Sequence, residues 1–129
     1  MKKTWMIGAI AAAVMCSAVG AYAGLKVNSP AMVSPTFAIA GMSDTRASND
    51  VNADVGCTVA HIAANAIIAF CSISDATGAT KTCVSSDPTM IQSVASITAN
   101  STIRMIFDAS GNCTQLYIDN YSAYRPITP

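Results

Sequence analysis

Charge is scarce in this chain of 129 residues, of which 11% are charged, seven of them basic and seven acidic, and no residue is a glutamate. A protein that binds nucleic acid through its phosphates needs an excess of lysine and arginine, which this chain lacks. Apolar residues make up 52% of the chain, too many for an intrinsically disordered protein. The length is too short for two ordinary domains. The composition therefore predicts a small folded protein without a nucleic-acid partner, and it indicates no activity.

Groups for acid–base and nucleophilic catalysis are also few. His61 is the only histidine, so a Ser-His-Asp or Cys-His arrangement would have to use it. The sequence has no G-x-S-x-G motif, and a histidine beside a hairpin more often packs than reacts. Asp75, Asp87 and Asp108 are explained by turns and a helix cap. We therefore expect no enzyme activity, no catalytic residue and no cofactor.

The first residues have the pattern of a bacterial export signal. Lys2 and Lys3 precede an apolar run over residues 5–19, and Ala21-Tyr22-Ala23 places small residues before a cleavage point. The run is shorter than the roughly 20 residues that a transmembrane helix needs. A lipoprotein signal would use Cys16, but the bulky Met15 precedes it. We expect residues 1–23 to be a removed signal peptide, which predicts a secreted or periplasmic protein with no membrane span.

Removal of that segment leaves four cysteines. An even number of cysteines in an oxidising compartment is best explained by two disulfides. Residues 57–129 would then form a disulfide-stabilised domain that is too small to be stable without such links. Residues 24–56 carry Pro30, Pro35 and a polar stretch, and we expect an arm or linker in which 37–40 pair as a short strand at most. The cysteines are Cys57, Cys71, Cys83 and Cys113.

One four-residue pattern occurs twice, as Asp75-Ala76-Thr77-Gly78 and as Asp108-Ala109-Ser110-Gly111. Aspartate favours the first position of a type I turn, and glycine can then adopt the left-handed conformation that continues it into a bulged hairpin. β-type runs flank both copies, and a third pairing is expected about residues 63–65. The expected strands are residues 57–62, 67–73, 80–84, 102–107 and 113–118.

A single helix is expected between these hairpins. Asp87 suits the N-cap position, Pro88 suits the first helical position, and an apolar stripe follows at helical spacing. The predicted fold class is therefore α+β: a small antiparallel sheet of hairpins, with about five strands and one covering helix, stapled by disulfides. The stripe consists of Met90, Ile91, Val94 and Ile97.

The turns also restrict the disulfide pairing. In a hairpin closed by Asp75 and Ala79, Cys71 lies opposite Cys83, and a hairpin centred on Ala64 places Cys57 opposite Cys71. Cys57 and Cys83 would then lie two strands apart, beyond the reach of a disulfide. Two pairings remain open, of which Cys57–Cys71 with Cys83–Cys113 is preferred.

The last hairpin presents apolar residues on both faces. The same turn geometry predicts that one face of this hairpin carries six residues. These are Ile103, Met105, Phe107, Cys113, Gln115 and Tyr117. Leu116 and Ile118 would lie on the other face with Arg104 and Ile106. Either both faces are covered, for example by the N-terminal arm, or one of them is a contact surface.

One acidic pattern has the spacing of a calcium loop. Asp50, Asn52, Asp54 and Gly56 follow D-x-N-x-D-x-G, which places three oxygen ligands on alternate residues. The glycine comes one position late for an EF-hand, and the distal glutamate is replaced by His61. A solvated polar linker explains the pattern equally well, so calcium is a weak candidate.

The C-terminal end is rich in side chains that favour protein interfaces or sugars. These side chains predict a contact surface at this end of the chain. For the protein as a whole, we expect a small exported, non-enzymatic binding or structural module. Its partner would be a protein or an envelope or extracellular component. The alternative is a secreted inhibitor of a protease or glycosidase that presents the loop of residues 63–65. The possible contact residues are Tyr117, Tyr121, Tyr124 and Arg125.

Overall fold

The fold consists of two antiparallel sheets with two short helices. It is seen in a computed structural model that describes residues 27–63 and 65–120. The four-stranded sheet has the order β1-β2-β6-β7, and the three-stranded sheet has the order β3-β4-β5. The elements are β1 (Met32–Val33), β2 (Phe37–Gly41), α1 (Met42–Ala47), β3 (Asp54–Ala63), β4 (Ala66–Ser74), β5 (Thr80–Ser85), α2 (Pro88–Ala95), β6 (Thr102–Phe107) and β7 (Cys113–Asp119).

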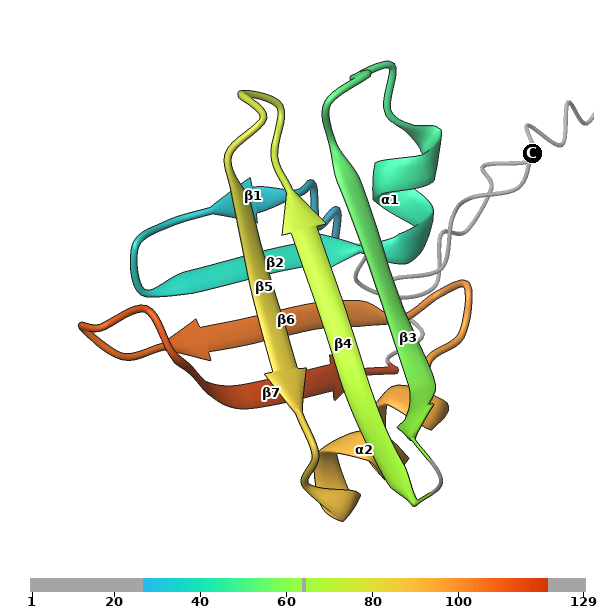
Figure 1. The fold of residues 1–129 in the computed structure, drawn as a ribbon. Coiled ribbons are helices and arrows are strands. Elements are labelled where there is room, and N and C mark those ends of the chain that lie inside the picture. The colour runs from blue at the N-terminus through green and yellow to red at the C-terminus, as the bar shows by residue number, and fades with distance from the viewer. Residues whose placement is uncertain (1–26, 64, 121–129) are drawn as a thin grey trace, which may run out of the picture.

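This arrangement confirms an antiparallel, β-rich α+β fold but corrects its details. The expectation was one sheet of about five strands with one helix, whereas the described residues form seven strands in two sheets and two helices. Figure 1 shows the three-stranded sheet lying across the four-stranded sheet. The buried core draws on both sheets and on α2. Its members are Ala38, Ala40, Ala69, Cys71, Ile73, Cys83, Val94, Ile103, Met105 and Phe107.

The difference in strand number comes mainly from the stretch expected as an arm or linker. Residues 37–41 form β2, which lies inside the four-stranded sheet and pairs with both β1 and β6. Ala38 and Ala40 are fully buried, because alternate side chains of a strand point to the same face. The side chains are short and carry no strong strand preference, so this pairing depends on long-range contacts with β6.

The two repeated turns form as predicted. The Asp75 N–H donates to the Ala79 carbonyl at 3.0 Å, and the Asp108 N–H donates to the Asn112 carbonyl at 3.0 Å. Gly78 and Gly111 have φ values of +83° and +84°, a conformation that costs glycine little. The turn sequence therefore fixes both hairpins locally.

Helix α2 also begins where the sequence predicts. Asp87 Oδ1 accepts hydrogen bonds from the N–H groups of Thr89 at 2.8 Å and Met90 at 3.1 Å. These bonds satisfy donors that have no partner within the helix. Val94 is the buried member of the apolar stripe, and Ile91 packs partly against the core.

The same hydrogen bonds lower the pKa of three aspartates. The pKa of Asp75 is lowered chiefly by the Thr77 hydroxyl, that of Asp87 by the Met90 N–H, and that of Asp108 by the Asn112 N–H. Each donor stabilises the charged carboxylate. The turn and cap carboxylates therefore bind protons less readily in the folded protein than in the unfolded chain.

This pKa difference predicts how stability depends on pH. A lowered pKa in the folded state stabilises the protein above the usual aspartate value of about 3.9, and the effect is lost as pH falls through the folded-state value. We expect the urea midpoint to stay level above about pH 5 and to fall below about pH 4. The triple variant Asp75→Asn, Asp87→Asn, Asp108→Asn should show a smaller acid-induced decline, because its amides accept hydrogen bonds without titrating. An equal decline in both proteins would contradict this assignment.

The β6–β7 hairpin corrects the predicted faces. Phe107 pairs with Cys113, but Ile106 pairs with Gln115, so the register shifts and Thr114 is an extra residue. Such a β-bulge reverses the alternation beyond it. Ile103 and Met105 therefore share the core face with Leu116 and Ile118, whereas Gln115 and Tyr117 lie opposite Ile106 and Arg104 on the outer face.

The two disulfides have the preferred pairing. Cys57 lies opposite Cys71 and Cys71 lies opposite Cys83, as the turn geometry predicts. The Cys57–Cys71 bond joins neighbouring strands, with 4.1 Å between Cα atoms. The Cys83–Cys113 bond joins β5 to β7, with 5.2 Å between Cα atoms, and so links the two sheets covalently.

Candidate functional site

An open apolar groove lies between α2 and the end of the β3–β4 hairpin. Its volume is about 670 Å³, within the range of about 300–1,000 Å³ that is typical of small-molecule sites. None of the described residues that line it is charged. The lining consists of Val59, Ile62, Asn65, Ala66, Ile67, Ile68, Ser86, Pro88, Ile91, Gln92 and Ala95.

The groove exists because the β3–β4 hairpin extends past its neighbour. β5 ends with Ser85 opposite Ala69, so the hairpin beyond Ala69 has no third strand beside it. α2 begins three residues after β5 and lies near this end of the three-stranded sheet (Figure 1). Val94 of α2 is buried in the core. Ile91, one turn earlier in the same helix, lines the groove.

The groove leaves large apolar side chains in contact with water. Ile62 is 62% exposed, Val59 is 37% exposed and Ile67 is 38% exposed. Isolated exposed apolar residues are ordinary on protein surfaces, but a concave group of them marks a binding site or an interface. The groove is therefore the candidate functional site of the described part of the chain.

Sequence analysis did not identify this groove. Its signal is the apolar pair Ile67-Ile68 together with Ile62 on the other side of the turn. A hairpin with apolar side chains on both faces needs another part of the protein, or a partner, to shield each face from water. Ile91 belongs to the predicted apolar stripe of the helix, and only the fold shows that this stripe contributes both to the core and to the groove.

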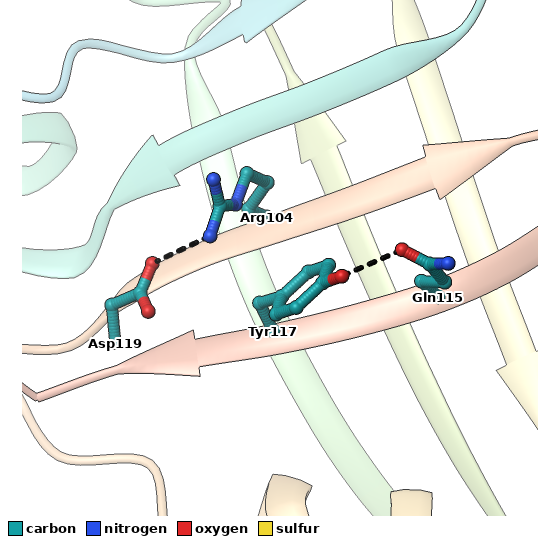
Figure 2. A network of polar contacts seen from close by, with 4 residues as sticks. All are labelled: Arg104, Gln115, Tyr117 and Asp119. Carbon is teal, nitrogen blue, oxygen red and sulfur yellow. Dashed lines mark hydrogen bonds and ion pairs between the residues drawn. The ribbon is translucent and has the colours of Figure 1, made fainter.

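A second candidate surface contains one of the predicted contact residues. Tyr117 is 42% exposed on the outer face of β7, and its hydroxyl hydrogen-bonds to Gln115 Oε1 at 2.6 Å. The Arg104 guanidinium lies 4.6 Å from the centre of the Tyr117 ring, and its Nη2 is 3.6 Å from Asp119 Oδ2. Figure 2 shows the hydrogen bond between Tyr117 and Gln115 and the ion pair between Arg104 and Asp119. Together these contacts hold an exposed aromatic ring in a defined orientation.

The other predicted contact residues cannot be placed on this surface. Tyr121, Tyr124 and Arg125 lie outside the described residues, as does the predicted signal peptide, residues 1–23. The Arg104–Tyr117 contact follows from the register shift, because the two residues are directly opposite each other only after the bulge. Sequence reasoning placed them on opposite faces.

The weak calcium candidate has other partners for its side chains. Asp50 Oδ1 accepts a hydrogen bond from the Asn52 N–H at 2.9 Å, and the Asn52 amide donates to the Ala76 carbonyl at 3.1 Å. Asp54 begins β3 opposite Ser74. Within residues 27–63 and 65–120, no group of three or more histidine, cysteine or acidic side chains is placed to hold a metal ion. The Asn52 contact ties the preceding loop to the Asp75 turn.

His61 lies at the edge of the groove without lining it. It is exposed on β3, directly opposite the lining residue Ile67 and next to the lining residue Ile62 in the chain. The four cysteines of the described residues are joined in disulfides, so their thiols are not available as nucleophiles or metal ligands.

These features define a small disulfide-linked protein of two antiparallel sheets, with an uncharged apolar groove at one end. Comparison with protein-family models, with curated proteins and with solved structures gives no match to this chain. In the part of the chain that the structure describes, no helix is long and apolar enough to cross a membrane. Two disulfides are typical of an oxidising compartment.

Proposed function

We propose that this protein is a small exported, non-enzymatic binding module that takes up an apolar partner in the groove between α2 and the β3–β4 hairpin. The groove itself is the observation on which the proposal depends. Export to the periplasm or cell exterior is supported by the charged and apolar pattern of residues 1–23 and by the disulfides. The partner is a component of the envelope or of the extracellular medium.

Energetics favour occupation of the groove. Removing apolar surface from water contributes about 25 cal/mol for each Å² buried, and Ile62, Val59 and Ile67 offer such surface on one concave wall. The walls belong to a hairpin tied by the Cys57–Cys71 bond and to a helix with a formed N-cap. A preformed site loses little conformational entropy on binding.

A charge placed in the groove should weaken this binding. We expect Ile62→Asp to weaken binding of the neutral fluorescent probe N-phenyl-1-naphthylamine by about tenfold or more, because the new carboxylate keeps water in the groove. Ile62 is 62% exposed, so the substitution leaves the core intact. Fluorescence titration of the disulfide-bonded protein measures the effect.

Val84→Asp is the matched control for this experiment. Val84 is 55% exposed and belongs to the same sheet, but it does not line the groove. The control should bind the probe as the parent does. A parent protein that does not bind the probe, or equal weakening in both variants, would contradict the proposal. A stable complex with a protease or glycosidase that survives Ile62→Asp would instead support the inhibitor alternative and its loop at residues 63–65.

A further inference from the structure

We propose that the groove selects uncharged aliphatic small molecules and rejects anionic amphiphiles such as fatty acids. This inference rests on the proposed binding function and specifies its ligand. The groove offers a ligand only neutral hydrogen-bonding side chains beside its apolar walls. These are the amides of Asn65 and Gln92 and the hydroxyl of Ser86. Together they suit the hydroxyl or carbonyl group of an uncharged, mainly hydrocarbon molecule.

No lysine or arginine of the described residues is placed to neutralise an anionic ligand, and the basic side chain beside the groove is that of His61, opposite Ile67. Lys81 lies opposite Ile73, at the end of β5 away from the groove, and its Nζ lies 4.9 Å from the centre of the Phe107 ring. Arg104 is on the other sheet beside Tyr117 and Asp119. Arg46 lines a separate small pocket with Asp54. A carboxylate in the groove would therefore lose hydration without gaining a lysine or arginine as an ionic partner, which is costly.

The nearest fixed charge is of the wrong sign for an anion. Asp87 stands between Ser86 and Pro88, both of which line the groove, and its carboxylate caps α2. Asp87 is exposed to solvent, so water and salt weaken its repulsion of an anion. The carboxylate therefore adds a small unfavourable effect at the mouth of the groove and offers an anion no compensation.

The extent of the apolar surface favours a small molecule over a protein partner. A stable protein interface buries about 800 Å² on each side. Here the apolar lining is interrupted by Asn65 at the hairpin turn and by Ser86 and Gln92 on the helix side. Phe70 and Val84, the exposed apolar residues of the same sheet, lie opposite each other on its outer face. Neither residue lines the groove.

Competition between matched ligands tests the inference. 1-Decanol and decanoate share their chain length but differ in charge at about pH 8, where a carboxylic acid is ionised. We expect 1-decanol to displace N-phenyl-1-naphthylamine from the parent protein at a concentration about tenfold lower than decanoate requires. Equal or stronger displacement by decanoate would overturn the ligand class while leaving the binding function intact. Absence of probe binding would overturn the binding function itself.

A charge introduced at the rim provides the second test. Gln92→Lys should strengthen decanoate binding about fivefold or more relative to 1-decanol binding, because only the carboxylate gains an ionic partner. Thr82→Lys adds the same charge at an exposed site that does not line the groove, and it should change neither affinity. Unchanged decanoate binding in Gln92→Lys would contradict the electrostatic basis. Loss of probe binding as a dimer forms at higher protein concentration would show that a second copy fills the groove, and would overturn the inference.

Discussion

Replacing both Cys83 and Cys113 with alanine is expected to lower the free energy of unfolding by about 3–4 kcal/mol. The bond closes a sequence separation of 30 residues, and a longer closed loop removes more entropy from the unfolded chain. It also joins the two sheets, whose shared core is small. A loss of this size is a large part of the stability of an ordinary small domain. Urea unfolding at neutral pH measures it.

The second disulfide is the natural comparison. Cys57 and Cys71 are separated by 14 residues and lie on strands that are already paired. The double variant Cys57→Ala, Cys71→Ala should therefore show a smaller loss in the free energy of unfolding, about 3 kcal/mol. A Cys83→Ala, Cys113→Ala protein that unfolds at the same urea concentration as the parent would contradict the role assigned to the bond. So would a fully reduced parent that keeps its stability.

Replacing Ile103 with alanine is expected to cost about 2–5 kcal/mol. Ile103 is fully buried on the core face of β6. It is among the largest of the fully buried side chains in the described residues. Its removal loses apolar contacts and leaves a cavity that the two sheets cannot fill without moving. The urea midpoint, with an unchanged slope, should report the loss.

Ile106→Ala is the control on the same strand. Ile106 lies on the outer face, opposite Gln115, and is partly exposed. The same truncation should therefore cost less than about half as much as Ile103→Ala. Equal losses at the two positions would contradict the face assignment that follows from the bulge at Thr114.

The two candidate surfaces are independent of each other in the fold. The groove belongs to the three-stranded sheet and α2, whereas Tyr117 and Arg104 belong to the outer face of the four-stranded sheet. Substitutions in one surface should therefore leave the other unaffected. A protein partner at Tyr117 and a small ligand in the groove are compatible with each other.

The sequence by itself determined the parts of this protein that depend on neighbouring residues. Asp75 and Gly78 specify one bulged hairpin, Asp108 and Gly111 specify the other, and Asp87 specifies the start of α2. Each acts through hydrogen bonds within four residues or through the backbone freedom of glycine. The position of Cys71 opposite Cys83 followed from the Asp75 turn, and its position opposite Cys57 followed from a hairpin centred on Ala64, because strand register is set by the hairpin.

Only the tertiary structure decided the features that depend on distant residues. The pairing of β2 with β6 joins segments more than sixty residues apart, and nothing local in the sequence around Ala38 specifies it. The single extra residue Thr114 reversed the faces of β7 and brought Tyr117 opposite Arg104. The groove arises because the β3–β4 hairpin extends past β5, and strand lengths are set by which partner is available. Local hydrogen bonds can be inferred from sequence patterns. These features instead depend on how the apolar faces of strands and helices from distant parts of the chain pack against one another in the core.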